Sequence, residues 1–97
     1  MGHTLTIVAH IEAHPEKLTL VRAELVRLIA PTRAEKGCIV YDLHQDNANP
    51  CVFKFLESWE TRDLWQAHMA SPHLKAYAKA TEGAIKEFVL NEMTPVG

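Results

Sequence analysis

The sequence predicts a single α+β domain of the ferredoxin-like class, with the element order strand, helix, strand, strand, helix, strand (βαββαβ). Two segments carry apolar residues at intervals of three and four, as amphipathic helices do. The segments around them alternate apolar and polar residues, or are rich in β-branched and aromatic residues, as strands are. The 97 residues suffice for one domain, spanning residues 1–97. We therefore expect a four-stranded antiparallel sheet with two helices on one face.

The first half of the chain contains two strands and one helix in this prediction. Residues 4–13 alternate between two faces, and the apolar face consists of Leu5, Ile7, Ala9 and Ile11. Helical spacing begins at Glu16, and Gly37 is the expected end of this helical region. Pro31 lacks an amide donor and should kink the helix near its end. The second strand is expected over Cys38–Gln45, which contains β-branched and aromatic residues.

The second half contains a turn, a strand, an interrupted helix and a last strand. Residues 46–50 read Asp-Asn-Ala-Asn-Pro, a composition typical of turns. The strand expected over residues 51–59 should therefore form an antiparallel hairpin with the strand before it. Thr61 should cap the next helix, and Ser71-Pro72 should interrupt and restart that helix. The last strand is expected from about Ile85 to Met93.

Composition argues against several classes of protein. Ten Lys and Arg against twelve Asp and Glu give a formal net charge of −2, which gives nucleic-acid binding little support. The apolar runs are too short for a membrane helix, and no secretory signal is expected. Two cysteines do not make a disulfide scaffold, and Cys38 and Cys51 should lie too far apart along the hairpin to pair. These features predict a cytoplasmic protein with reduced cysteines.

Several strands carry apolar residues on both faces of the expected sheet. This is seen in the neighbouring pairs Ile7-Val8, Val40-Tyr41 and Phe55-Leu56. Two helices cover only one face, which would leave the large side chains of the other face in water. A twofold-related copy of the same sheet is the simplest cover. The pattern therefore predicts a homodimer that packs sheet to sheet.

Three stretches form a recognisable series: Ala30–Cys38, Tyr41–Asp46 and Glu57–Glu60. Together with His68 and Ser71–Leu74, they resemble the antibiotic biosynthesis monooxygenase domain family, and within it the small quinol monooxygenases. The resemblance implies a dimeric α+β barrel with a pocket between the sheet and helices of each subunit. The best-known enzymes of the family oxygenate phenols or quinols with O2 and use no metal, flavin or haem. The resemblance thus implies a small aromatic substrate and no cofactor.

The same resemblance places candidate residues around the pocket. Trp59 and Glu57 fall on the strand that would face it, and His68 and His73 fall on the helix that would cover it. The family also includes haem-degrading enzymes, an isomerase of a phosphorylated signalling-molecule breakdown product, and members without known activity. The haem-degrading members have an axial His one turn beyond His73, where this chain has Ala78. Haem binding is therefore not expected.

Oxygenation without a cofactor needs a base for the phenolic proton, a dry pocket and a donor that stabilises the oxygenated intermediate. Histidine suits the role of base near neutral pH. His73 and His68 are the candidate bases, and Glu57 is the candidate partner that orients an imidazole. Each has a structural alternative. His73 could be a surface residue at a helix start or one that bonds its neighbours. His68 could be a core-edge residue bonded to the backbone, and Glu57 half of a salt bridge with a helix arginine.

Trp59, Tyr41 and His44 are the candidate substrate-binding residues. Trp59 alternates with Glu57 on one strand, and the alternative for Trp59 is an ordinary core position. Tyr41 and His44 belong to the neighbouring strand of the hairpin. We expect these side chains to line the pocket.

Six histidines raise the question of a metal ion, but the chain contains neither Cys-x-x-Cys nor His-Glu-x-x-His. His68 and His73 are five residues apart, about 140° around a continuous helix, which is wrong for shared ligation. We therefore expect no metal site.

Three functions need the same dry pocket with a few polar groups. The favoured one is a cofactor-independent monooxygenase that oxidises a quinol or another electron-rich aromatic with O2. The second is an isomerase or tautomerase that uses the same base to move a proton next to a carbonyl. The third is a non-catalytic stress-response module that binds a small apolar ligand. The sequence contains no internal test among them.

Overall fold

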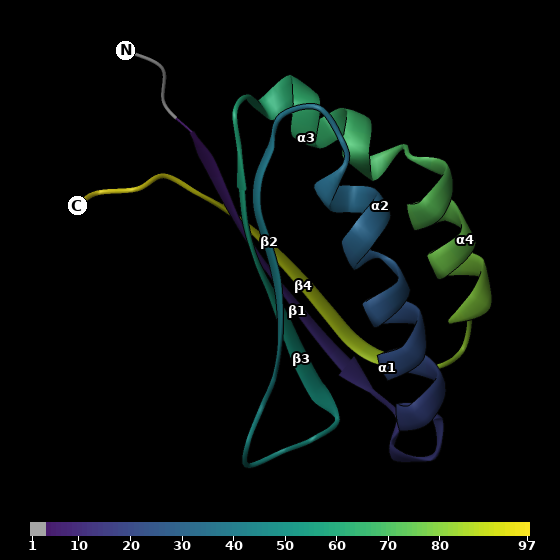
Figure 1. The fold of residues 1–97 in the computed structure, drawn as a ribbon. Helices are drawn as coiled ribbons and strands as arrows, with labels where there is room; N and C mark the ends of the chain where they lie inside the picture. Colours follow the sequence, from purple (N-terminus) through teal and green to yellow (C-terminus); the bar gives the residue numbers. More distant parts are fainter. Residues whose placement is uncertain (1–3) are drawn as a thin grey trace.

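The computed structural model describes residues 4–97 and confirms the predicted ferredoxin-like order of elements (Figure 1). Four antiparallel strands form one sheet: β1 (Leu5–Ala13), β2 (Cys38–Gln45), β3 (Val52–Trp59) and β4 (Ile85–Met93). Their order across the sheet is β2-β3-β1-β4, so β1 and β3 are central and β2 and β4 are the edges. The predicted strand bounds agree to within one residue.

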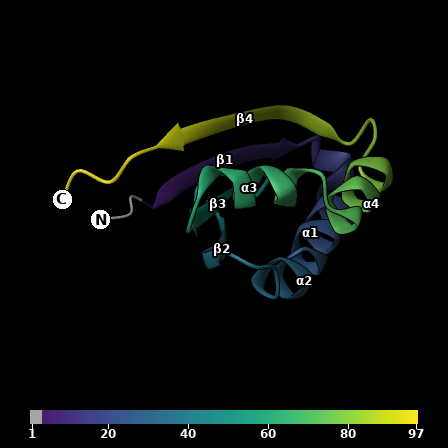
Figure 2. The same cartoon turned by 90° about the horizontal axis from the view of Figure 1, so that it is seen from above.

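Two helical regions connect the strands, and both are interrupted. The first consists of a 3-10 turn, η1 (Pro15–Lys17), followed by α1 (Leu18–Arg27) and α2 (Ile29–Arg33). The second consists of α3 (Arg62–Met69) and α4 (Pro72–Ala80). All of them lie on one side of the sheet, as Figures 1 and 2 show. The two predicted helices are thus two helical regions, each made of shorter helices.

The interruptions follow from proline and from helix caps. Pro31 has no N–H for the carbonyl of Arg27, and the helix divides between these two residues, at Leu28. The Thr61 hydroxyl accepts the Leu64 N–H at 3.1 Å, and the Ser71 hydroxyl accepts the Leu74 N–H at 3.3 Å. Both predicted N-caps are confirmed. Because α4 has its own cap, it begins in a new direction after α3.

The core lies between the helices and one face of the sheet. Alternate residues of β1 and β3 point into it, and the helices contribute an apolar stripe. Its buried members include Ile7, Ile11, Val21, Leu25, Phe53, Phe55 and Trp59. This burial is the main source of stability, because apolar area leaves water.

The sequence predicted no membrane helix and two unpaired cysteines, and the structure bears on both points. Among residues 4–97, no helix has the length and apolar character needed to cross a membrane. Cys38 and Cys51 are free thiols, as predicted from their spacing.

Gly37 closes the turn between α2 and β2. Its φ of 88° lies in the left-handed region, which suits glycine. The Gly37 carbonyl accepts the Glu60 N–H at 2.8 Å, which ties the turn to the end of β3. A β-carbon on Gly37 would lie 2.8 Å from Cβ of Leu64 on α3. The turn therefore packs against the start of α3 with no room for a side chain.

We predict that Gly37→Ala destabilises the protein by about 3 kcal/mol, since it adds left-handed strain to a clash with Leu64. Gly83→Ala is the matched control, because Gly83 has a φ of 78° and a β-carbon added there would have no atom within 4 Å. It should cost only the strain, about 1 kcal/mol. Urea unfolding of both variants measures the difference. Equal losses would contradict the close packing at Gly37.

Candidate active site

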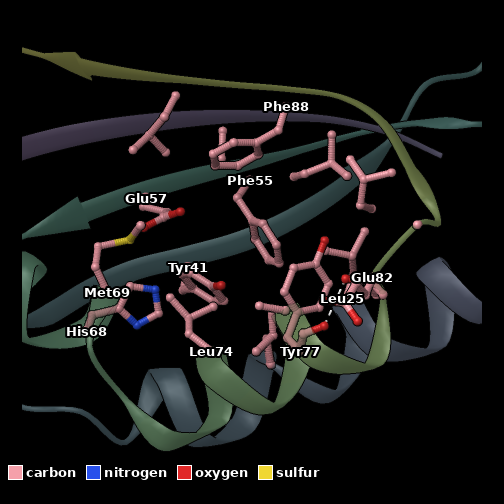
Figure 3. A pocket seen from close by; sticks show the side chains of 18 residues that line it. Leu25, Tyr41, Phe55, Glu57, His68, Met69, Leu74, Tyr77, Glu82 and Phe88 are labelled. Carbon is pink, nitrogen blue, oxygen red and sulfur yellow. Dashed lines mark hydrogen bonds between the residues drawn. The ribbon is translucent and has the colours of Figure 1, made fainter.

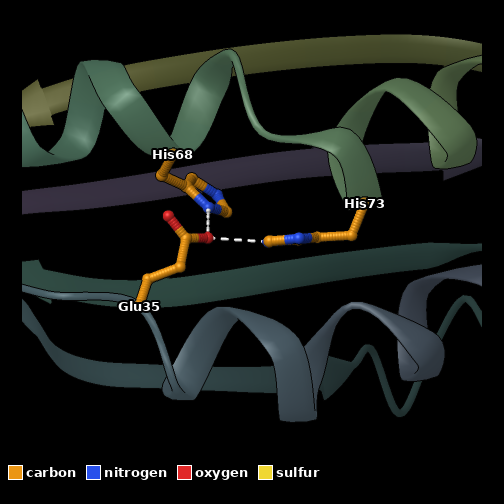
Figure 4. Close-up of side chains that lie close together, drawn as sticks. All are labelled: Glu35, His68 and His73. Atoms are coloured by element: carbon orange, nitrogen blue, oxygen red, sulfur yellow. Dashed lines mark hydrogen bonds and ion pairs between the residues drawn. The ribbon is translucent and has the colours of Figure 1, made fainter.

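Glu35 joins two histidines from different helices (Figure 4). Its Oε2 atom lies 2.6 Å from Nδ1 of His68 on α3 and 2.7 Å from Nε2 of His73 on α4. An ionised carboxylate only accepts hydrogen bonds, so each of these ring nitrogens donates an N–H to the same oxygen. Glu35 itself stands in the turn closed by Gly37. One carboxylate oxygen therefore connects that turn to both α3 and α4.

His68 is the most deeply buried member of this group. Its side chain is 2% exposed, against 18% for Glu35 and 21% for His73. Burial lowers the pKa of His68 and outweighs the hydrogen bond and negative charge of Glu35, which act to raise it. The ring is therefore neutral near neutral pH, with its proton on Nδ1 and its lone pair on Nε2. Among residues 4–97, Nε2 of His68 has no hydrogen-bond partner.

A cavity of about 470 Å³ lies between the sheet and the helices, where the family resemblance implied a pocket (Figure 3). Its walls are largely apolar. The helices contribute Leu25, Leu28 and Leu74, and the strands contribute Ile11, Phe55 and Leu90. The side chains of His68, Glu57 and Tyr41 also line it, so a few polar atoms face a cavity whose wall is otherwise largely apolar.

Aromatic rings fix the orientation of His68. The Trp59 ring lies 4.8 Å from it, centroid to centroid, with an interplanar angle of 32°. Tyr41 meets His68 edge-on at 5.5 Å and stacks on Phe55 at 4.4 Å. Burial raises the pKa of Tyr41, so its phenol stays protonated. These contacts and the Glu35 hydrogen bond leave the imidazole little freedom.

Glu57 is a second carboxyl group at the cavity. It is 4% exposed, and its Oε1 accepts the indole N–H of Trp59 at 2.9 Å. Burial raises the pKa of Glu57 to about 7, against the lowering effect of the Trp59 hydrogen bond; the charge of Glu35 adds to the rise. Near neutral pH this group is partly protonated, so it can donate as well as accept a hydrogen bond.

The structure corrects the predicted position of His44. This residue is exposed and does not line the cavity. Side chains alternate along β2, so Tyr41 and Leu43 face the helices while His44 faces the other side of the sheet.

Three further expectations change in detail. His73 contacts Glu35 but lines a separate hollow, together with Arg27 and Glu24, and not the main cavity. Trp59 is fully buried and does not line the cavity, which agrees with its alternative as a core residue. Glu57 pairs with Trp59, not with a histidine or a helix arginine.

Glu35 is the residue that sequence reasoning missed. It belongs to the stretch Ala30–Cys38 that carries the family resemblance, but it stands in a turn, where periodicity assigns no face. The predicted carboxylate partner was Glu57, which does lie on an inward-facing strand position. Only the folded arrangement shows that the carboxylate bonded to His68 comes from the turn.

Among residues 4–97, the same three residues are one of two groups that could hold a metal ion. Glu35, His68 and His73 each offer one ligand atom, and these atoms lie within 4.8 Å of one another. The second group is His10, Glu12 and Glu87. The angle predicted between His68 and His73 does not apply, because α3 and α4 are separate helices. Hydrogen bonds already satisfy the first group internally, so its geometry does not require an ion.

Fold and site together define a small α+β domain with a largely apolar cavity beside an oriented histidine. Comparison with known families is more specific. The family model described as "Antibiotic biosynthesis monooxygenase" matches residues 4–80. The chain therefore belongs to the antibiotic biosynthesis monooxygenase family, as the sequence resemblance indicated.

Individual relatives agree with this assignment. The Escherichia coli protein named "Probable quinol monooxygenase YgiN" is 27% identical over 101 residues, covering 94% of this chain and 97% of YgiN. Rv0793 of Mycobacterium tuberculosis is 32% identical over 77 residues, covering 79% of this chain and 75% of Rv0793. The crystal structure of PA3566 from Pseudomonas aeruginosa superimposes with a TM-score of 0.95 at 30% identity, covering 100% and 98% of the two chains.

The raised pKa of Glu57 predicts a pH-dependent stability. The folded protein binds this proton more tightly than the unfolded chain, so the free energy of unfolding falls as the pH rises from 4.5 towards 7. The free energy of unfolding of Glu57→Gln, relative to that of the wild type, should therefore be about 2.5 kcal/mol higher at about pH 8 than at about pH 5. Urea unfolding at the two pH values measures this shift. The exposed Glu60→Gln variant is the control, and a Glu57 difference that does not change with pH would contradict the prediction.

Proposed function

We propose that this chain is a cofactor-independent monooxygenase that oxidises a quinol or another electron-rich hydroxyaromatic with O2, with His68 as the general base. One observation carries the proposal. The buried imidazole of His68 lines the cavity, and its Nδ1 atom donates a hydrogen bond to Oε2 of Glu35, 2.6 Å away. Family membership and the quinol monooxygenase name of YgiN support the choice of reaction and substrate.

The first step is removal of the substrate's hydroxyl proton. Nε2 of His68 accepts the proton, the O–H bond breaks, and its electron pair stays on oxygen. Glu35 stabilises the resulting imidazolium through the Nδ1–H that it already accepts. The aryloxide is a much better electron donor towards O2 than the neutral phenol is.

The overall reaction balances without an external reductant. A hydroquinone and O2 give a hydroxyquinone and water: one oxygen atom enters the ring, and the other leaves with two hydrogens from the substrate. The substrate thus supplies all the electrons. Glu57, protonated in part near neutral pH, is the group placed to donate a hydrogen bond to the oxygenated intermediate.

Oxygen uptake with a panel of hydroquinones and naphthoquinols, corrected for autoxidation, tests the proposal. We expect His68→Gln to lose about 100-fold or more in rate, because the base is gone. Glu35→Gln should lose about 10-fold to 100-fold, because the imidazole loses its charged partner. His44→Gln is the matched control and should keep the wild-type rate, since His44 does not line the cavity.

The alternatives predict other results in the same experiment. Full activity in His68→Gln would rule out His68 as the base. A product formed equally fast without O2 would show an isomerase or tautomerase. Tight binding of the aromatic compounds with no turnover would show a ligand-binding module.

We also propose that two copies of the chain pack sheet to sheet. Helices cover one face of the sheet, and the opposite face carries Leu56, Val89 and Met93, which are 46%, 42% and 49% exposed. The register places Leu56 on β3 and Val89 and Met93 on β4, on either side of Val8 on β1. A self-complementary apolar face of this kind suits a twofold dimer.

Leu56→Glu should convert the dimer to a monomer, because it places two charges in an apolar interface. Light scattering coupled to size exclusion measures the molar mass. Leu20→Glu makes the same change at a leucine on α1 that is 38% exposed, and it should leave the dimer intact. A monomeric wild-type protein would disprove the proposed assembly.

A further inference from the structure

The cavity lining carries no fixed positive charge. Among residues 4–97, neither lysine nor arginine lines it. Its two carboxyl groups are those of Glu57 and Glu82, and its only basic side chain is the buried His68. Arg27, which approaches from α1, lines the separate hollow beside His73. A negatively charged ligand would therefore find acidic groups in this cavity and no permanent counter-charge.

An anion without a partner is costly to bury in an apolar site. The protein's own carboxyl group in this cavity already shows the effect. Burial is the largest cause of the raised pKa of Glu57, although Trp59 donates a hydrogen bond to it. A carboxylate or phosphate on a ligand would meet the same apolar walls.

Glu82 adds a second unfavourable contribution to the binding of an anion, and this one depends on how the ligand is oriented. Figure 3 shows Glu82 and His68 at opposite ends of the cavity, with Phe55 and Tyr41 between them. Glu82 is exposed, so it stands at the rim of the cavity. A ligand whose hydroxyl points to His68 therefore presents its far end to Glu82. A negative group at that end would be repelled, and a neutral group would not.

We infer that the cavity selects uncharged hydroxyaromatic molecules and rejects their carboxylated or phosphorylated analogues, with Glu82 as a specificity-determining residue. The inference rests on the proposed function only for the orientation of the ligand, with its hydroxyl at His68. The volume of about 470 Å³ lies in the usual range of small-molecule sites. Because neither lysine nor arginine among residues 4–97 lines this cavity, the inference also argues against a phosphorylated substrate.

Two ligands of the same shape test the inference in the intact protein. In 6-hydroxy-2-naphthamide and 6-hydroxy-2-naphthoate, the hydroxyl and the second substituent lie at opposite ends of the ring system. Calorimetry near neutral pH should show the amide binding at least about 30-fold more tightly than the carboxylate. Glu82→Lys should tighten carboxylate binding about 3-fold to 10-fold and leave the amide unchanged, because the new charge lies at a solvated rim.

Glu60→Lys is the matched control, since Glu60 is exposed and does not line the cavity. It makes the same change in net charge and should leave both affinities unaltered. The inference would be overturned if the wild type bound the two ligands equally tightly, or if it bound neither ligand. An unchanged ratio in Glu82→Lys would remove the role of Glu82. Selective binding of the amide, together with no quinol-dependent O2 uptake, would keep the charge selectivity and reject the monooxygenase proposal.

Discussion

A single carboxylate oxygen organises this molecule. Oε2 of Glu35 accepts hydrogen bonds from His68 on α3 and His73 on α4. The turn that carries Glu35 also packs against Leu64 at the start of α3. Three segments that are separate in sequence thereby meet at one atom. The orientation of His68 depends on this meeting, because the shared oxygen fixes which ring nitrogen carries the proton. The tautomer of His68, its orientation and the relative placement of α3 and α4 therefore all depend on the same contacts of Glu35.

The second constraint is the low polarity of the cavity. The same dry walls lower the pKa of His68 and raise the pKa of Glu57, so both groups prefer their uncharged forms. A neutral imidazole can accept a proton and a neutral carboxyl group can donate one. Desolvation thus leaves two groups in one cavity uncharged, one able to accept a proton and the other able to donate a hydrogen bond, an arrangement found in many enzymes that work near neutral pH.

The order and bounds of the elements and the places where helices break were predictable from the sequence, whereas the side-chain contacts made by a turn were not. Alternation in β1 and β3 and the caps at Thr61 and Ser71 gave the order and bounds of the elements, because these signals are local. Alternation along β2 would also have placed His44 away from Tyr41, on the outer face. Glu35 had no such signal, since a turn has no periodic face. The contact between His68 and His73 through Glu35 depends on the break after α3, whose direction a sequence pattern does not specify.

The pairing of β1 with β4 has a consequence for how the chain acquires its site. Ile11 near the N-terminus pairs with Phe88 near the C-terminus, and both line the cavity. Contacts between such distant residues carry a large loop-closure cost and form slowly. In a nascent chain whose β4 has not yet emerged, β1 is therefore an unpaired sheet edge, and the cavity lacks the wall that β4 provides. The cavity is therefore complete only once β4 has paired with β1.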